Sequence, residues 1–177
     1  MNSPRRRFLK VGAGLAAGSL LPLASRASLV QERWLDFFHT HTHEKLRITY
    51  AIQEAYVPEA LTELNRFLRD HYSGEIGSID PQLFDLLWQV RQQIGSTRPF
   101  EVISGYRCAE TNDALRARGG GGVAKKSLHM EGRAIDVRLS GVPLADLRRA
   151  AIALQGGGVG YYAGQFVHID TGRVRQW

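Results

Sequence analysis

The sequence predicts an α+β domain in which a small antiparallel sheet packs against helices. The order of the hydrophobic patterns carries this prediction: two helical patterns come first, and short strand patterns with one inserted helix follow. The length supports a single domain, because 177 residues leave about 150 for a core once an N-terminal targeting segment is set aside.

The start of the domain, residues 34–50, reads as a hairpin. Residues 45–50 alternate polar and apolar side chains, as a half-buried strand does. His39, His41 and His43 recur at every second position, which would place them on one face of an extended segment. This arrangement permits a metal site, but Glu44 is the only acidic partner at ligand spacing, so an exposed hairpin bend is favoured.

Two helices follow, and we expect them to be scaffold. Residues 58–72 carry leucines at helical spacing, and a second helix begins with Asp80 as its N-cap and Pro81 in its first turn. An apolar stripe runs along this second helix to Ile94.

The chain then alternates between strands and helices. A strand at 100–103 ends at the segment 104–107, and a short helix after it stops at the glycines 119–122, which predict a mobile loop rather than a phosphate cradle. The remaining expected elements are a strand at 134–139, a helix at 143–154, and strands at 159–162 and 165–170.

The first 27 residues have the pattern of an export signal. An Arg-Arg-x-Phe-Leu-Lys motif at residues 5–10 precedes an apolar run at 11–23 and small residues around Ala27. This resembles a twin-arginine signal, whose pathway exports folded proteins to the periplasm. A permanent anchor is the alternative, but the run is shorter than the ~20 residues that a spanning helix needs. We therefore predict a signal at 1–27, cleaved after Ala27, and a domain at 28–177.

Composition narrows the function classes. Five of the 23 basic residues lie in the first 27 residues, which leaves 18 basic against 17 acidic side chains in the domain. A nucleic-acid-binding function thereby loses its main support, and contact with the membrane is expected only during export. Cys108 is the only cysteine, so an intramolecular disulfide is excluded, and we expect this residue to be structural.

The segment 127–136 is the most informative stretch of the sequence. It places His129 in a loop and Asp136 seven residues later on the following strand, with Gly132 allowing the chain to turn between them. By strand alternation, residues 135, 137 and 139 face the core, so Asp136 faces the open side of the sheet.

The last predicted strand shows the same alternation of core-facing and open-facing residues. Val167 and Ile169 face the core, whereas His168 and Asp170 face away from it. If the two strands are neighbours, His168 and Asp136 converge on one point, with His129 above them.

Two histidines and one carboxylate suit a catalytic zinc ion. They fill three tetrahedral positions and leave the fourth for water, which the metal acidifies. Taken singly, either histidine reads as a hydrogen-bonded structural residue, and Asp136 as a surface partner of Arg133 or Arg138. The agreement of both strand phases favours the zinc site.

The motifs resemble a known group of enzymes. Ser-x-His-x-x-Gly-x-Ala-x-Asp at residues 127–136 is similar to the zinc signature of the D-alanyl-D-alanine metallopeptidase, lysostaphin and hedgehog clan, and Ser-Gly-Tyr-Arg at 104–107 matches its strand-end motif. The tail from 157 to 177 resembles the exported murein endopeptidases of the MepK type. His41-Thr42-His43-Glu44 resembles the His-Thr-Gly-Glu turn of that branch, with His43 in place of glycine.

The resemblance implies a zinc-dependent, periplasmic murein endopeptidase that cuts peptide cross-links between peptidoglycan stem peptides, and we expect it to act as a monomer. Two alternatives stay open: a non-catalytic, zinc-containing module that binds the cell wall, and a D,D- or L,D-carboxypeptidase acting on stem peptides. The residues leave the bond preference undetermined.

The resemblance also assigns supporting roles around the zinc. Relatives place a glutamate or histidine shortly before the third ligand, where this chain has Gln165. Asp170 is therefore a candidate catalytic base, or else it orients a histidine ligand. Arg107 is a candidate for binding a stem-peptide carboxylate or the oxyanion, with a structural ion pair as the alternative. Glu131 is a weaker candidate base, and the tyrosines Tyr106, Tyr161 and Tyr162 are expected in the cleft wall.

Overall fold

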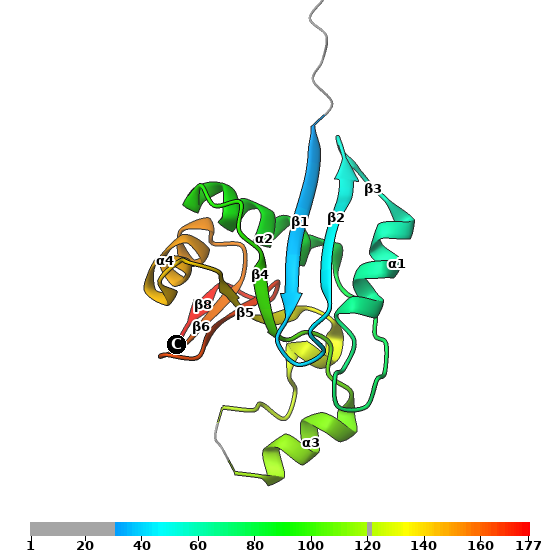
Figure 1. Cartoon of the computed structure of the whole chain (residues 1–177). Coiled ribbons are helices and arrows are strands. Elements are labelled where there is room, and N and C mark those ends of the chain that lie inside the picture. Colours follow the sequence, from blue (N-terminus) through cyan, green and yellow to red (C-terminus); the bar gives the residue numbers. More distant parts are fainter. Residues whose placement is uncertain (1–30, 120–121) are drawn as a thin grey trace, which may run out of the picture.

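A computed structural model of the chain describes residues 31–119 and 122–177 (Figure 1). The expected export signal lies outside these residues, as does part of the glycine loop. The described residues form one eight-stranded sheet with the strand order β3-β2-β1-β4-β5-β7-β6-β8. Its strands are β1 (Glu32–His39), β2 (Lys45–Ile52), β3 (Ala55–Tyr56), β4 (Phe100–Ser104), β5 (Ala134–Leu139), β6 (Gly158–Tyr162), β7 (Phe166–Asp170) and β8 (Arg175–Gln176).

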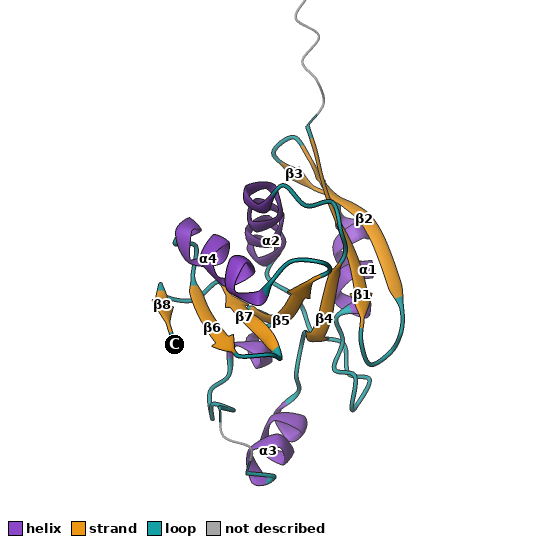
Figure 2. Ribbon diagram, turned by 60° about the vertical axis from the view of Figure 1, so that its left-hand side comes forward, coloured by secondary structure: helices purple, strands orange, loops and turns teal. Residues whose placement is uncertain are grey.

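Four α-helices within the described residues accompany the sheet. One hydrophobic core joins the inner face of the sheet to α1, α2 and α4, and Figure 2 shows α2 and α4 side by side over the sheet, with α3 projecting away from it. The helices are α1 (Pro58–Phe67), α2 (Pro81–Ile94), α3 (Ala109–Ala117) and α4 (Leu144–Leu154), with a 3-10 turn η1 (Leu128–Glu131) before β5. In this part of the chain, none of the helices combines the length and apolarity that a membrane crossing requires.

The α+β class is confirmed, but the expectation of a small, purely antiparallel sheet was wrong. The strand β1 pairs with β4 in parallel, and β6 pairs with β8 in parallel. The first pairing arises because the chain passes through α1 and α2 before β4 returns beside β1, and a connection of that length is what a parallel pair needs. This pairing joins the N-terminal hairpin to the later strands in one sheet.

The ends of the two scaffold helices differ in how well the sequence predicted them. Asp80 caps α2 as expected, and its side chain accepts a hydrogen bond from the backbone N–H of Gln82. In contrast, α1 ends at Phe67 rather than at residue 72. The carboxylate of Asp70 accepts backbone N–H groups of Tyr72 and Cys108, so it stabilises a turn there instead of a further helical turn.

The hairpin bend is present, but its histidines do not share one exposed face. His39 is fully buried at the end of β1, whereas His41 and His43 are exposed. His43 has a φ of 59°, which breaks the extended alternation. His41 instead stacks on His71 with parallel rings 4.1 Å apart. Parallel stacked rings do not point their nitrogens at a common ion, so this cluster offers no metal site as it is arranged.

The middle of the sheet aligns the polar residues of three strands. Asp136 of β5 lies opposite His168 of β7 on one side and opposite Ser104 of β4 on the other. On the inner face, neighbouring residues of these strands such as Ile135 and Val167 are fully buried in the core. The sheet therefore presents Asp136 and His168 together on the face away from α2 and α4.

Candidate metal centre

His129 is held in place by the turn that precedes β5. The Ser127 side chain caps η1 by accepting the backbone N–H of His129, and Gly132 ends it in the left-handed conformation with a φ of 66°. A Cβ at residue 132 would overlap the carbonyl oxygen of Ser78. Glycine is therefore needed here for its conformation and for the close approach of another backbone segment.

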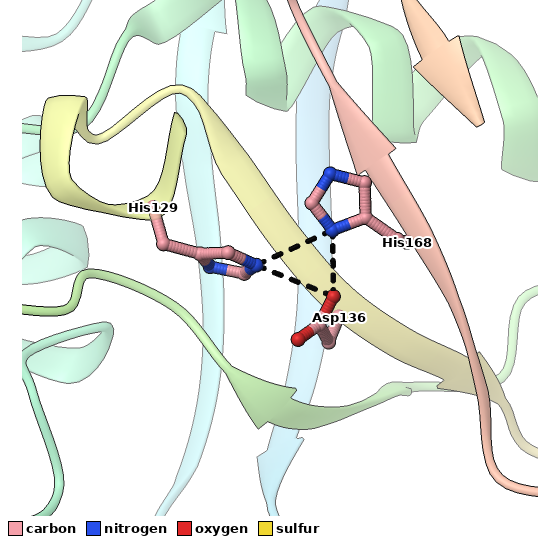
Figure 3. Close-up of side chains that lie close together, drawn as sticks. All are labelled: His129, Asp136 and His168. Atoms are coloured by element: carbon pink, nitrogen blue, oxygen red, sulfur yellow. Dashed lines mark hydrogen bonds and ion pairs between the residues drawn. The ribbon is translucent and has the colours of Figure 1, made fainter. Parts of the chain in front are cut away.

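The three predicted ligands converge on one point (Figure 3). His168 Nδ1 lies 2.8 Å from Asp136 Oδ1, and His129 Nε2 lies 3.3 Å from each of those two atoms. All three residues are at most 8% exposed. The structure thus brings together the one loop residue and the two strand residues that the sequence pattern singled out.

Both histidines are oriented through their second nitrogen. His129 Nδ1 lies 2.7 Å from the carbonyl oxygen of Gly105, and His168 Nε2 lies 3.1 Å from Asp170 Oδ2. In the neutral form of each imidazole, an acceptor at this position holds the single proton there, so the inward nitrogen carries the lone pair that a metal ion can use. This donor set of two imidazole nitrogens and one carboxylate oxygen fits a divalent metal ion.

The electrostatics of the cluster also suit a cation. Burial would raise the pKa of Asp136, but the neighbouring His129 and His168 lower it below its usual range. Burial lowers the pKa of His168, whereas its hydrogen bonds with Asp136 and Asp170 raise it, to about 9. Two carboxylates therefore stabilise positive charge at His168, and a binding metal ion has to displace a proton there.

Asp170 is enclosed rather than open to the cavity. It has no exposed surface, and it accepts hydrogen bonds from the Arg175 guanidinium and from two backbone N–H groups besides its contact with His168. Burial raises the pKa of Asp170, and these hydrogen bonds lower it below the usual range. A carboxylate this well satisfied is a weak proton acceptor, so its position supports the orienting role over that of base.

Arg107 lies at the edge of the cluster. Its Nη2 donates to Ser104 Oγ at 3.2 Å and stands 3.8 Å from Asp136 Oδ2. The side chain lines the cavity above the ligands. Because its ion pair with Asp136 is long, the guanidinium keeps donors free for a group in the cavity.

The ligands lie at the base of a cavity of about 450 Å³. One wall comes from the segment 122–128, which includes Lys126, and the other from Tyr162, Phe166 and Trp177 near the chain end. Of the described lining residues, Asp136 has the only carboxylate side chain, while the side chains of Arg107, Lys126 and Arg175 are cationic. The cavity is therefore suited to an anionic molecule.

Several residues of the site differ from the sequence-based expectation. Tyr162 lines the cavity as predicted, but Tyr106 donates to Glu75 and Tyr161 lies beside Arg148, so neither forms the wall. Glu131 pairs with Arg133 on the surface and is absent from the cavity lining.

Sequence reasoning missed Lys126, Trp177 and Arg175. Arg175 and Trp177 belong to the tail that resembles the murein endopeptidases, but nothing in that pattern indicated a role for either residue, and Lys126 lies just before the motif at 127–136.

Comparison with known proteins gives one consistent result. The model of the protein family described as peptidoglycan L,D-endopeptidase MepK matches residues 27–177. The chain is 42% identical over 176 residues to the peptidoglycan L,D-endopeptidase MepK of Escherichia coli K12, an alignment that covers 98% of this chain and 96% of that protein. It is 39% identical over 178 residues to the probable peptidoglycan L,D-endopeptidase MepK of Haemophilus influenzae Rd, covering 98% and 95%.

Proposed function

This chain belongs to the family of peptidoglycan L,D-endopeptidase MepK, and from that premise we propose that it hydrolyses peptide cross-links of peptidoglycan with a zinc ion held by His129, Asp136 and His168. The convergence of one oxygen and two nitrogens within 3.3 Å carries the metal part of the proposal. The names of the relatives, which describe them as L,D-endopeptidases, support the substrate part and favour a bond between an L-centre and a D-centre.

The residues around the proposed zinc ion have different roles in catalysis. A zinc ion held by His129, Asp136 and His168 would supply an acidified water and would polarise the scissile carbonyl. Asp136 lends the charge that holds the cation, while Gly105 and Asp170 keep the imidazoles of His129 and His168 turned toward it. Arg107 lines the cavity beside Asp136, and its guanidinium would stabilise negative charge on the scissile carbonyl or bind a carboxylate of the stem peptide.

The signal pattern at residues 1–27 and the peptidoglycan substrate together suggest where the protein acts. We propose that residues 1–27 direct export by the twin-arginine route and that the domain works in the periplasm, where its substrate lies. One chain supplies all three proposed ligands and every described residue of the cavity lining, which supports action as a monomer.

The function is tested with purified protein and cross-linked muropeptides. The protein should bind about one zinc ion, lose cleavage on treatment with a chelator and regain it with added zinc. His168→Ala should abolish cleavage while the protein stays folded. His43→Asn is the matched control, because it replaces an exposed histidine that has a positive φ with a residue that tolerates this conformation.

The outcomes separate the candidate functions. Full cleavage by His168→Ala would refute the zinc mechanism. Tight zinc binding without cleavage of any muropeptide would favour a wall-binding module, which the lack of a free carboxylate in the described cavity lining makes a specific alternative. Mass analysis of digested sacculi distinguishes an endopeptidase from a carboxypeptidase, since only the former separates cross-linked stems.

A further inference from the structure

Asp170 lies at the centre of a built hydrogen-bonding network behind His168. Its Oδ1 accepts the backbone N–H groups of Gly158 at 3.0 Å and Gly172 at 2.8 Å, and Arg175 Nη1 approaches it at 3.1 Å. Its Oδ2 accepts from Arg175 Nη2 at 2.7 Å and contacts His168 Nε2 at 3.1 Å. One oxygen atom therefore joins the guanidinium to the ligand imidazole.

The backbone around this network leaves room only for the guanidinium. A Cβ at residue 158 would overlap Arg175 Nη1 and Asp170 Oδ2, and a Cβ at residue 172 would lie 2.8 Å from Asp170 Oδ1. Glycines at both positions let the strand backbone and the arginine approach the carboxylate together.

Arg175 reaches Asp170 from the last strand of the sheet. The strand β8 lies beside β6 (Figure 1) and pairs with it in parallel. Arg175 is in register with Gly158. The guanidinium also stands 4.8 Å from the ring centroid of Trp177. Two parallel hydrogen bonds and an adjacent aromatic ring fix the plane of the guanidinium, which a lysine does not reproduce.

We infer that Arg175 is a positioning residue for the metal centre: it fixes the Asp170 carboxylate, which fixes the ring of His168 with Nδ1 toward Asp136 and His129. Loss of the guanidinium leaves Asp170 with its two backbone donors, which both bind Oδ1, so Oδ2 loses its strongest partner. The orientation of His168 then depends on a less constrained carboxylate. The inference rests on the metal site of the proposed function, and it assigns part of the metal affinity to β8.

The test measures zinc affinity in the absence of substrate, by competition with a chromophoric chelator. Arg175→Gln should raise the zinc dissociation constant about 10- to 100-fold, as loss of an outer-shell partner does in other metal sites. Arg175→Lys should give a smaller increase, because it keeps the charge but not the paired hydrogen bonds. Arg173→Gln is the matched control, since it removes a positive charge from an exposed residue two positions away.

A double-mutant cycle shows whether Arg175 acts through Asp170. Asp170→Asn should also weaken zinc binding, and the Asp170→Asn, Arg175→Gln protein should bind no more weakly than Asp170→Asn alone. Additive losses, or a dissociation constant of Arg175→Gln within twofold of the unsubstituted protein, would overturn the inference even if thermal stability falls. If Arg175→Gln does not fold, Arg175→Lys decides by the same comparison.

The result is distinct from a failure of the proposed function. Unsubstituted protein that binds no zinc would refute the metal site itself and the positioning role with it. Unsubstituted protein that binds zinc only as tightly as Arg175→Gln and Arg175→Lys do would refute the role of Arg175 alone.

Discussion

Gly132→Ala tests whether the turn between His129 and Asp136 is as tightly constrained as the structure shows. Residue 132 has a φ of 66°, and a left-handed conformation costs a residue with a Cβ about 1–2 kcal/mol. The added methyl group would also overlap the backbone carbonyl of Ser78, and overpacking of this kind costs about 1–3 kcal/mol. We therefore expect the free energy of unfolding to fall by about 2–5 kcal/mol.

Gly141→Ala is the matched control for this change. Residue 141 has a φ of 75°, and a methyl group added there would meet nothing within 4 Å, so only the conformational cost applies. Its substitution should cost about 1–2 kcal/mol. Urea unfolding of both variants in the presence of a chelator measures the difference without a contribution from bound metal.

The same pair of variants connects the turn to the metal site. The Gly132 carbonyl accepts the backbone N–H of Asp80, so a shift at this residue also displaces the chain that carries His129. Zinc affinity should fall in Gly132→Ala and stay unchanged in Gly141→Ala. Equal losses of stability in the two variants, together with equal zinc affinity, would refute the reasoning.

Three further predictions concern a buried histidine, the cavity wall and the bound metal. Burial, with neighbouring imidazoles, lowers the pKa of His39 from 6.5 to about 4. The contribution of neutral His39 to the free energy of unfolding should therefore be fully present above pH 6.5 and fall by about 2 kcal/mol from pH 7 to 5, because the unfolded chain takes up a proton first. His39→Asn should flatten this pH dependence, measured by urea unfolding. Lys126→Gln should raise KM for an anionic muropeptide several-fold, measured by steady-state cleavage, with zinc affinity intact, because Lys126 lines the cavity and is not a ligand. Zinc at 100 times its dissociation constant should stabilise the protein by about 2.7 kcal/mol, and His168→Ala should lose this gain in calorimetry.

The convergence of Asp136 and His168 was predictable because strand alternation is a local property. The apolar partners of Asp136 and His168 fix which face each residue takes, and the structure confirms that the two face each other across β5 and β7. The predicted loop position of His129 needed only the glycine that follows it. Local patterns were therefore sufficient for the residues that converge in the centre.

Long-range pairing and side-chain networks were not accessible in this way. The parallel contact of β1 with β4 joins segments about 60 residues apart in the sequence. The hydrophobic pattern of a strand does not indicate which other strand it pairs with. The role of Arg175 was missed because an arginine near a chain end is most often a solvated surface residue. Burial of His39 was missed because the sequence-based prediction placed this residue in the exposed bend, whereas β1 extends through it.

The two histidines of the candidate metal centre differ in how easily a point mutation would disturb their orientation. His129 is steered by a main-chain oxygen, which persists through nearly any exchange of side chains around it, with Gly105 itself as the sensitive position. His168 is steered by a carboxylate that a single codon change can delete, within a network that needs specific residues at 158, 172 and 175. In a saturation mutagenesis screen for cell-wall cleavage, loss-of-function alleles within the final twenty codons should therefore occur at residues 158, 170, 172 and 175 as well as at His168 itself.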